Sequence, residues 1–359
     1  MPALPKLDHV LALSDDVGII QHATESVPNR STGYCTDDVA RAFMVALMYD
    51  RLVPEQNEAI HLAATYLAFL HDAQLRDGRF HNFMSYSRTW LDDVGTHDSV
   101  GRAMWALGYG MRYAPTQAWR RVCRDHFNRA LGAVDWLLEH HHAQAYAVLG
   151  LTHACVAEDN GTYRRALGAL AARLHEIYLP DPQWTWFEDE MTYDNGRLPE
   201  AMVRAGITLH KSAYVEAGIA ALDFLESVTI EDGIFVPIGN EGWYRRGGTR
   251  ARYAQQPLEA FAMIDAELAA FDADGRPERL AAADLALAWY EGKNSLYVPM
   301  GVGGGCYDGL ESTGPNRNMG AESTLARLAG AYTMAECRRG RNASHGEVLR
   351  DDDPGVRST

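Results

Sequence analysis

The sequence predicts an all-α protein built as a ring of six helical hairpins, and three observations lead to this fold class. Apolar residues recur at helical spacing along nearly the whole chain of 359 residues. The joints between helical stretches alternate between short, plain ones and long ones rich in Trp, Tyr, Asp, Glu and Gly. Alternate helices begin roughly every 55 residues, as expected for a repeated helix pair. Strict alternation places every long joint at one end of the ring, where binding and chemistry usually occur.

In chain order, the apolar spacing predicts helices at 36–52, 58–74, 97–112, 117–139, 143–157, 161–178, 197–210, 212–227, 254–270, 277–291 and 321–336. A shorter stretch near 5–14 would be the twelfth helix and would close the ring. We expect residues 1–337 to form this single domain. Residues 338–359 are polar and lack an apolar period, so we expect a disordered tail there.

The charge and composition limit the classes of partner. The formal net charge is -15 and the pI is near 5.3, which disfavours nucleic acids and anionic membranes and favours a neutral ligand. No apolar run reaches the ~20 residues needed to span a bilayer, and residues 1–20 show no signal-peptide pattern. The five cysteines are scattered, which indicates free thiols and predicts a cytoplasmic location.

Part of the helical repeat is visible residue by residue. Residues 36–42 (TDDVARA) align with residues 97–103 (HDSVGRA), so that each helix has a carboxylate in its first turn and an arginine one turn later. Helix capping would explain Asp37 and Asp98 as well as a functional role would. A second echo places Glu200 and Glu259 near the starts of two further alternate helices.

Aromatic residues are concentrated in the long joints. Four of the eight tryptophans lie there, namely Trp90, Trp184, Trp186 and Trp243. Exposed tryptophans are costly, so these side chains either pack the long loops together or line a pocket. Because they are interleaved with carboxylates and amides, they indicate a carbohydrate-binding cleft.

Hydrolysis of a glycosidic bond requires two carboxyl groups, one of which keeps its proton. Residues 186–190 (WFEDE) offer an aromatic wall and crowded acids, both of which raise a carboxyl pKa. This makes Glu188 or Asp189 one candidate. Asp37 or Asp38, from a distant hairpin, is the expected partner in the same basin. Further acidic candidates are Asp98, Asp194, Glu259 and Glu322.

A metal or cofactor is not expected. The run His140-His141-His142 is at consecutive positions, whose side chains do not face one another on a helix. The run of glycines at 303–305 does not match a phosphate-binding loop.

Five segments together resemble a known bacterial domain that is found in association with glycosyltransferases. They are residues 33–41 (GYCTDDVAR), 98–103 (DSVGRA), 192–200 (TYDNGRLPE), 255–260 (QQPLEA) and 320–324 (GAEST). The helical repeat over about residues 5–336 resembles the six-hairpin glycosidase superfamily, whose members are (α/α)6 toroids. The resemblance implies a sugar-related activity and a glycosyltransferase as a functional partner. No nucleotide-sugar signature is present, so transferase activity itself is not implied.

The leading hypothesis is an inverting glycoside hydrolase that acts on a neutral oligosaccharide or polysaccharide. Its expected substrate-binding residues are Tyr34, Arg41, Asp98, Arg102, Trp186, Asp194, Asn195, Glu200, Trp243, Gln256, Glu259 and Glu322. A phosphorylase would need an anion pocket, for which Arg245, Arg246, Arg250 and Arg252 are the possible sources. An epimerase would need paired histidines, and His81 and His97 are the candidates. A non-catalytic sugar-binding module is the remaining alternative.

Overall fold

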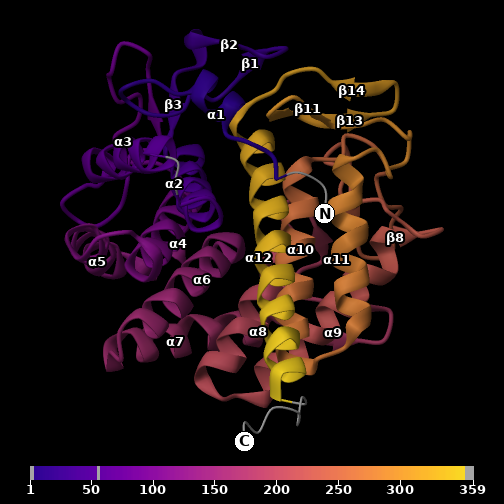
Figure 1. The fold of residues 1–359 in the computed structure, drawn as a ribbon. Helices are drawn as coiled ribbons and strands as arrows, with labels where there is room; N and C mark the ends of the chain where they lie inside the picture. Colours follow the sequence, from indigo (N-terminus) through magenta and orange to yellow (C-terminus); the bar gives the residue numbers. More distant parts are fainter. Residues whose placement is uncertain (1–3, 55–56, 352–359) are drawn as a thin grey trace, which may run out of the picture.

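The computed structural model describes residues 4–54 and 57–351, with side chains up to residue 341. This part of the chain forms an (α/α)6 toroid (Figure 1). Each helix of the inner ring contacts the next, and the last contacts the first. The inner helices are α2 (Thr36–Leu52), α4 (His97–Tyr113), α6 (His141–Ala157), α8 (Arg197–Leu209), α10 (Pro257–Asp274) and α12 (Ala321–Asp351).

An outer helix packs against each inner helix. Five of these are α3 (Asn57–Ala73), α5 (Gln117–Leu131), α7 (Gly161–Ile177), α9 (Ser212–Thr229) and α11 (Pro277–Tyr290). The short helix α1 (Asp8–Leu13) contacts α12 and takes the sixth position. The predicted ring of six hairpins, including its closure by residues near 5–14, is therefore confirmed.

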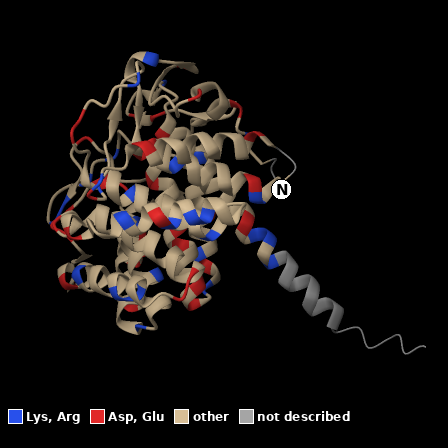
Figure 2. Cartoon of the chain, turned by 90° about the vertical axis from the view of Figure 1, so that its left-hand side faces the viewer, with Lys and Arg blue, Asp and Glu red and all other residues tan. Residues whose placement is uncertain are grey.

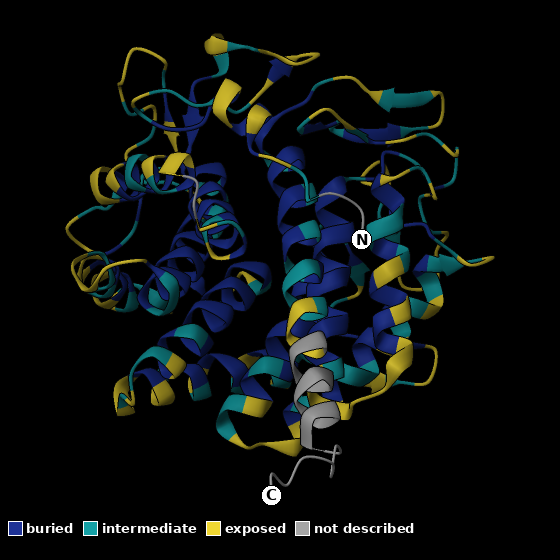
Figure 3. Ribbon diagram, in the orientation of Figure 1, coloured by how far each residue is buried: buried dark blue, intermediate teal, exposed yellow. Residues whose placement is uncertain are grey.

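The inner helices are buried on almost every side, whereas the outer helices expose one face (Figure 3). Small residues allow the inner helices to approach closely. A Cβ atom at Gly150 of α6 would lie 2.5 Å from the carbonyl oxygen of Met104 in α4. Only glycine fits at such a backbone contact, so this position fixes the spacing of α4 and α6.

The long joints contain short two-stranded pairs. Two pairs join different loops: β3 (Tyr34–Cys35) pairs with β4 (Phe83–Met84), and β7 (Glu190–Met191) pairs with β10 (Tyr244–Arg245). The other strands are β1 (Ala23–Thr24), β2 (Val27–Pro28), β5 (Leu179–Asp181), β6 (Trp184–Trp186), β8 (Ile230–Glu231), β9 (Ile234–Phe235), β11 (Gly301–Val302), β12 (Gly305–Cys306), β13 (Gly309–Glu311) and β14 (Gly314–Asn316). Figure 1 shows β1, β2, β3, β11, β13 and β14 together at one end of the ring. The β3–β4 pair connects the segment before α2 with the α3–α4 joint, and the β7–β10 pair connects the α7–α8 and α9–α10 joints.

Of the described helices from α2 onwards, three, namely α5, α10 and α12, have an end that lies three or more residues from the expected position, whereas the others agree within two residues. The helix expected at 117–139 ends at Leu131, before Gly132, and a 3₁₀ turn follows at Val134–Leu137; glycine is a poor helix former. Helix α10 begins at Pro257, which is favourable at the first helical position. Helix α12 continues to Asp351, beyond the expected end at 336. The rest of the expected tail, 352–359, lies outside the described residues, and the domain boundary at 337 stays a prediction.

The described cysteines are free thiols. Acidic and basic residues are interspersed on the side of the molecule shown in Figure 2. Within the described ranges, no helix combines the length and apolar character that crossing a bilayer requires.

Candidate active site

A cleft of about 450 Å³ opens at the loop end of the ring. Each inner helix follows a long joint, so its N-terminus lies at this end. Three inner helices supply the charged floor of the cleft: α2 with Asp37, Asp38 and Arg41, α4 with Asp98 and Arg102, and α12 with Glu322. Helix N-termini favour carboxylates, which accounts for the concentration of acidic residues here.

The floor is a row of alternating charges. Arg41 donates to Asp38 Oδ1 at 3.1 Å and to Glu322 Oε2 at 2.6 Å. Arg102 Nε lies 3.7 Å from Asp37 Oδ1. The two arginines, one turn after the carboxylates in the sequence repeat, thus connect one helix of the ring to the next.

The caps of these helices are other residues. The Sγ atom of Cys35 accepts from the backbone N–H of Asp38, and the hydroxyl of Thr96 accepts from that of Ser99. The carboxylates of Asp37 and Asp98 therefore do not serve as N-caps. Asp98 instead accepts from the Tyr193 hydroxyl at 2.7 Å.

Asp37 and Asp38 differ in how their charge is satisfied. Burial raises the pKa of both, that of Asp38 to about 7, against the opposing effect of nearby arginines. Asp38 nevertheless accepts from Arg41 and from the Cys35 thiol. Asp37 Oδ1 is buried and has no hydrogen-bond partner among the described residues. A buried carboxylate oxygen that accepts no hydrogen bond is costly, which favours a proton on Asp37 even though Arg102 lies 3.7 Å from that oxygen.

The walls of the cleft combine aromatic and amide side chains. Trp243, Phe83 and Tyr193 supply aromatic surface, and Asn240 and Gln256 supply amides. The backbone at Trp243 has φ of 50°, an uncommon conformation for a bulky residue that often marks functional sites.

The other loop tryptophans pack the loops together. Trp184 and Trp186 are 3% and 1% exposed, and Trp90 stacks on His81 with ring centroids 4.7 Å apart. Trp243 lines the cleft. Trp186 was expected to line it too, but it lies outside the cleft. Trp186 belongs to β6, which pairs with β5.

Glu188 and Asp189 do not share the cleft with Asp37 and Asp38, which corrects the expected single basin. They line a separate pocket beside Trp184 and Trp186. Glu188 Oε1 lies 2.5 Å from His141 Nδ1. Although burial raises the pKa of Glu188, His141 and His142 outweigh it and lower the pKa overall. The aromatic wall and crowded acids thus do not produce the raised pKa of a proton donor.

Four further expected residues form a buried network below the floor, and a fifth lies apart from it. Arg197 of α8 binds Asp194 at 3.3 Å and Glu200 at 2.6 Å. Glu259 accepts from the backbone N–H groups of Asp194 and Asn195. Tyr34 is 1% exposed and donates to Asp15 at 2.6 Å. None of these five residues lines the cleft. The four residues of the network, Asp194, Asn195, Glu200 and Glu259, lie below the cleft floor and support it.

The network reaches the floor through Asp194. Its Oδ2 accepts from Arg102 at 3.0 Å and from the Tyr146 hydroxyl at 2.7 Å. The left-handed backbone at Asp194, with φ of 50°, places the carboxylate between Arg102 and Arg197.

The candidate groups for a phosphorylase or an epimerase lie elsewhere. Arg246 pairs with Asp181, and Arg250 and Arg252 pair with Glu231. His81 stacks on Trp90, and His97 stacks on His140 at 3.4 Å. His22 is the histidine among the cleft-lining residues that the structure describes.

Eight of the described lining residues were not among those expected from the sequence, namely Gln21, His22, Cys35, Phe83, Tyr193, Asn240, Leu258 and Asp308. Asp308 accepts from Ser323 at 2.5 Å and from Asn318 at 2.6 Å, and burial raises its pKa. Its position in a glycine-rich joint was a usable signal. His22 and Phe83 had none, because their positions depend on contacts between distant segments: His22 contacts Asn318 at 3.0 Å, and Phe83 belongs to β4, which pairs with β3.

Comparison with solved structures supports the fold. A sugar epimerase from a ruminal bacterium has a TM-score of 0.72 at 12% identity, covering 90% of this chain and 93% of that one. Cellobiose 2-epimerase of Bacillus thermoamylovorans has 0.71 at 12%, covering 91% and 95%. A GH76 α-mannanase of Bacteroides thetaiotaomicron has 0.64 at 11%, covering 93% and 95%. No family model and no curated protein sequence matches this chain. At such identities the similarity establishes the (α/α)6 toroid alone.

Proposed function

We propose that this protein is an inverting glycoside hydrolase for a neutral sugar chain, with Asp37 as general acid and Glu322 as general base. The observation that carries this proposal is the difference between two carboxyls on one cleft floor. Asp37 has a buried oxygen that accepts no hydrogen bond, on a side chain that is 17% exposed, while the side chain of Glu322 is 36% exposed at the other side of Arg41. A carboxyl that keeps its proton and a carboxylate that can accept one from water are the two groups that inversion needs.

In this mechanism Asp37 donates its proton to the glycosidic oxygen as the bond from that oxygen to the anomeric carbon breaks. Glu322 accepts a proton from a water whose oxygen bonds to the anomeric carbon from the opposite face. Arg102, 3.7 Å from Asp37, stabilises the carboxylate that forms. Proton exchange with solvent then restores both groups.

The cleft walls favour a carbohydrate. The indole of Trp243 offers a face for the apolar side of a pyranose, and Asn240 and Gln256 offer donors and acceptors for hydroxyl groups. The fold supports this class of substrate, since it is shared with a GH76 α-mannanase and with GH9 endoglucanases. A functional association with a glycosyltransferase and a cytoplasmic location stay predictions from the sequence.

Sugar epimerisation is the second candidate, because two proteins similar in fold, with TM-scores of 0.72 and 0.71, are epimerases and His22 lines the cleft. Epimerisation would exchange a carbon-bound hydrogen with solvent. Deuterium incorporation into an unhydrolysed sugar in D₂O would favour this candidate over hydrolysis.

The test is incubation of the purified protein with linkage-defined neutral glucan and mannan oligosaccharides, followed by NMR of the fresh products. We expect cleavage with inverted anomeric configuration. Asp37→Asn and Glu322→Gln should each lower kcat/KM by about 10² to 10⁴. Asp189→Asn is the matched control, because the side chain of Asp189 is 85% exposed and outside the cleft. Full activity of both cleft variants would contradict the assignment.

A further inference from the structure

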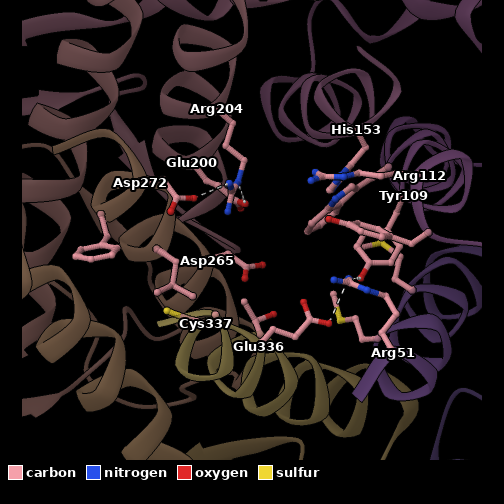
Figure 4. A pocket seen from close by; sticks show the side chains of 18 of the residues that line it. Arg51, Tyr109, Arg112, His153, Glu200, Arg204, Asp265, Asp272, Glu336 and Cys337 are labelled. Atoms are coloured by element: carbon pink, nitrogen blue, oxygen red, sulfur yellow. Dashed lines mark hydrogen bonds and ion pairs between the residues drawn. The ribbon is translucent and has the colours of Figure 1, made fainter. Parts of the chain in front are cut away.

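A second cavity, of about 540 Å³, lies at the end of the ring opposite the loops. Residues near the C-terminal ends of α2 and α4 line it, together with residues of α6, α8, α10 and α12. Figure 4 shows Arg204, Glu200 and Asp272 on one side of the cavity and His153, Arg112 and Arg51 on the other. The two cavities thus open at opposite ends of the ring.

Four arginines of the described chain line this cavity, Arg51 of α2, Arg112 of α4, Arg204 of α8 and Arg341 of α12, and the first three differ in their ion-pair partners. Arg51 pairs with Glu336 at 3.2 Å, and Arg204 pairs with Glu200 at 3.0 Å. Arg112 lies 4.7 Å from the ring centre of Tyr113 and forms no ion pair within the described part of the chain. Arg112 therefore has no carboxylate at ion-pair distance within the described residues, although its charge opposes the rise that burial causes in the pKa of Glu336 across the cavity.

The four carboxylates among the described lining residues lie at ion-pair distance from other arginines, Asp272 at 3.6 Å from Arg204 and Glu336 at 3.2 Å from Arg51. Glu200 and Asp265 both bind the buried Arg197, at 2.6 and 2.7 Å. Burial, together with Arg112, Arg204 and Arg51, lowers the pKa of His153 to about 3. His153 is therefore neutral at physiological pH, and the three arginines near it oppose its protonation.

Two buried polar atoms of the lining also lack partners. Trp105 is 5% exposed, and its indole N–H has no hydrogen-bond partner among the described residues. The same holds for Nδ1 of His153. Buried polar groups are normally satisfied, and an anion with several oxygens would accept from such a donor and from guanidinium groups together.

We propose that this second cavity binds a phosphate group, either as inorganic phosphate or as the monoester of a small sugar, through Arg112 with Arg51 and Arg204. Three guanidinium groups that approach from α2, α4 and α8 suit a tetrahedral oxyanion better than a planar one. The volume leaves room for a sugar beyond the phosphate.

A continuous series of ion pairs connects this cavity to the cleft floor. Arg204 binds Glu200, which binds Arg197, which binds Asp194, at 3.0, 2.6 and 3.3 Å. Asp194 in turn binds Arg102, which lies 3.7 Å from Asp37. An anion that draws Arg204 away from Glu200 changes the electrostatic field along this series of ion pairs, as far as Asp37. The bound phosphate therefore alters turnover at the cleft, a consequence that rests on the proposed hydrolase function.

Binding is tested without turnover, by isothermal titration of the purified protein with inorganic phosphate, glucose 6-phosphate and glucose. We expect both phosphates to bind. Arg112→Gln should weaken their affinity about tenfold or more, the loss typical of one charge-assisted hydrogen bond, and Arg112→Lys should weaken it less. Arg317→Gln is the control, because Arg317 is 71% exposed and distant in the fold. Tighter binding of glucose 6-phosphate than of phosphate identifies the monoester, and equal binding identifies the free ion.

A spectroscopic readout locates the ligand. NMR titration of His153 should show its pKa rise when phosphate is bound, because the anion offsets the charges of the nearby arginines, and Arg112→Gln should abolish this rise. The absence of any phosphate binding at millimolar concentration, or equal binding by wild type and Arg112→Gln with an unchanged thermal midpoint, would overturn the proposal. Neither result bears on hydrolysis at the cleft, which the oligosaccharide assay tests separately.

Discussion

Replacing Arg197 by methionine tests the buried network on which the cleft floor rests. Arg197 is 1% exposed and binds three carboxylates, at 3.3 Å to Asp194, 2.6 Å to Glu200 and 2.7 Å to Asp265. Methionine keeps the length of the side chain but leaves these buried charges with less compensation. Removing one partner of a buried ion pair costs roughly 3–5 kcal/mol. Asp194 and Glu200 retain contacts to other arginines, so we expect a loss within this range rather than a multiple of it.

The assay is urea denaturation at pH 7 of wild type, Arg197→Met and the control Arg173→Met. Arg173 has a side chain that is 47% exposed and pairs with Glu176 at the surface, so its replacement should cost less than about 1 kcal/mol. The double variant Arg197→Met/Asp265→Asn should recover part of the loss, because it removes one uncompensated charge. A loss below about 1 kcal/mol for Arg197→Met, at an unchanged m-value, would refute the reasoning.

Three further predictions address packing, substrate binding and pH. Gly150→Ala should lower the free energy of unfolding by about 1–3 kcal/mol, since its Cβ would meet a backbone carbonyl. Thermal unfolding measures this loss. An unchanged midpoint would contradict the close packing of α4 and α6. Trp243→Ala should weaken the free energy of oligosaccharide binding by about 0.5–1.5 kcal/mol without changing the thermal midpoint. Calorimetry measures this affinity in the Asp37→Asn background. An unchanged affinity would show that the sugar does not stack on the indole face. Burial raises the pKa of Asp194, but Arg197 and Arg102 outweigh it and hold the pKa at about 2, below its unfolded value of 3.8. This carboxylate therefore contributes about 2 kcal/mol of stability above pH 4, and this contribution is lost as the pH falls towards 2. Asp194→Asn should make the free energy of unfolding depend less on pH over that range. The same pH dependence in the variant as in the wild type would argue against the depressed pKa.

The helices were predictable because each has a continuous apolar stripe and its ends carry local signals. Two of these local signals went unused: α10 begins at Pro257, later than predicted, and α5 ends before Gly132, earlier than predicted. The alternation of short and long joints was sufficient to place the loops at one end, because it depends on chain order alone.

The floor of the cleft was predictable for a similar reason. Asp37, Asp98 and Glu322 occupy the first turns of inner helices, and that position fixes where they lie in a ring. Side chains carried by loops were not predictable in this way. The placement of Glu188 depends on its contact with His141, and that of Trp186 depends on the pairing of β5 with β6. No local pattern encodes the contact between Glu188 and His141, which lies 47 positions earlier in α6.

The central claim is that Asp37 is the proton donor for cleavage of a glycosidic bond. The most direct test compares the pH dependence and rate of wild type and Asp37→Asn on an oligosaccharide with a poor leaving group and on one with an activated aryl leaving group. The account predicts a loss of about 10² to 10⁴ on the poor leaving group, a much smaller loss on the activated one, and the disappearance of the alkaline limb of the pH profile in the variant. Equal losses on both substrates with an unchanged alkaline limb, or no cleavage by the wild-type protein, would contradict it.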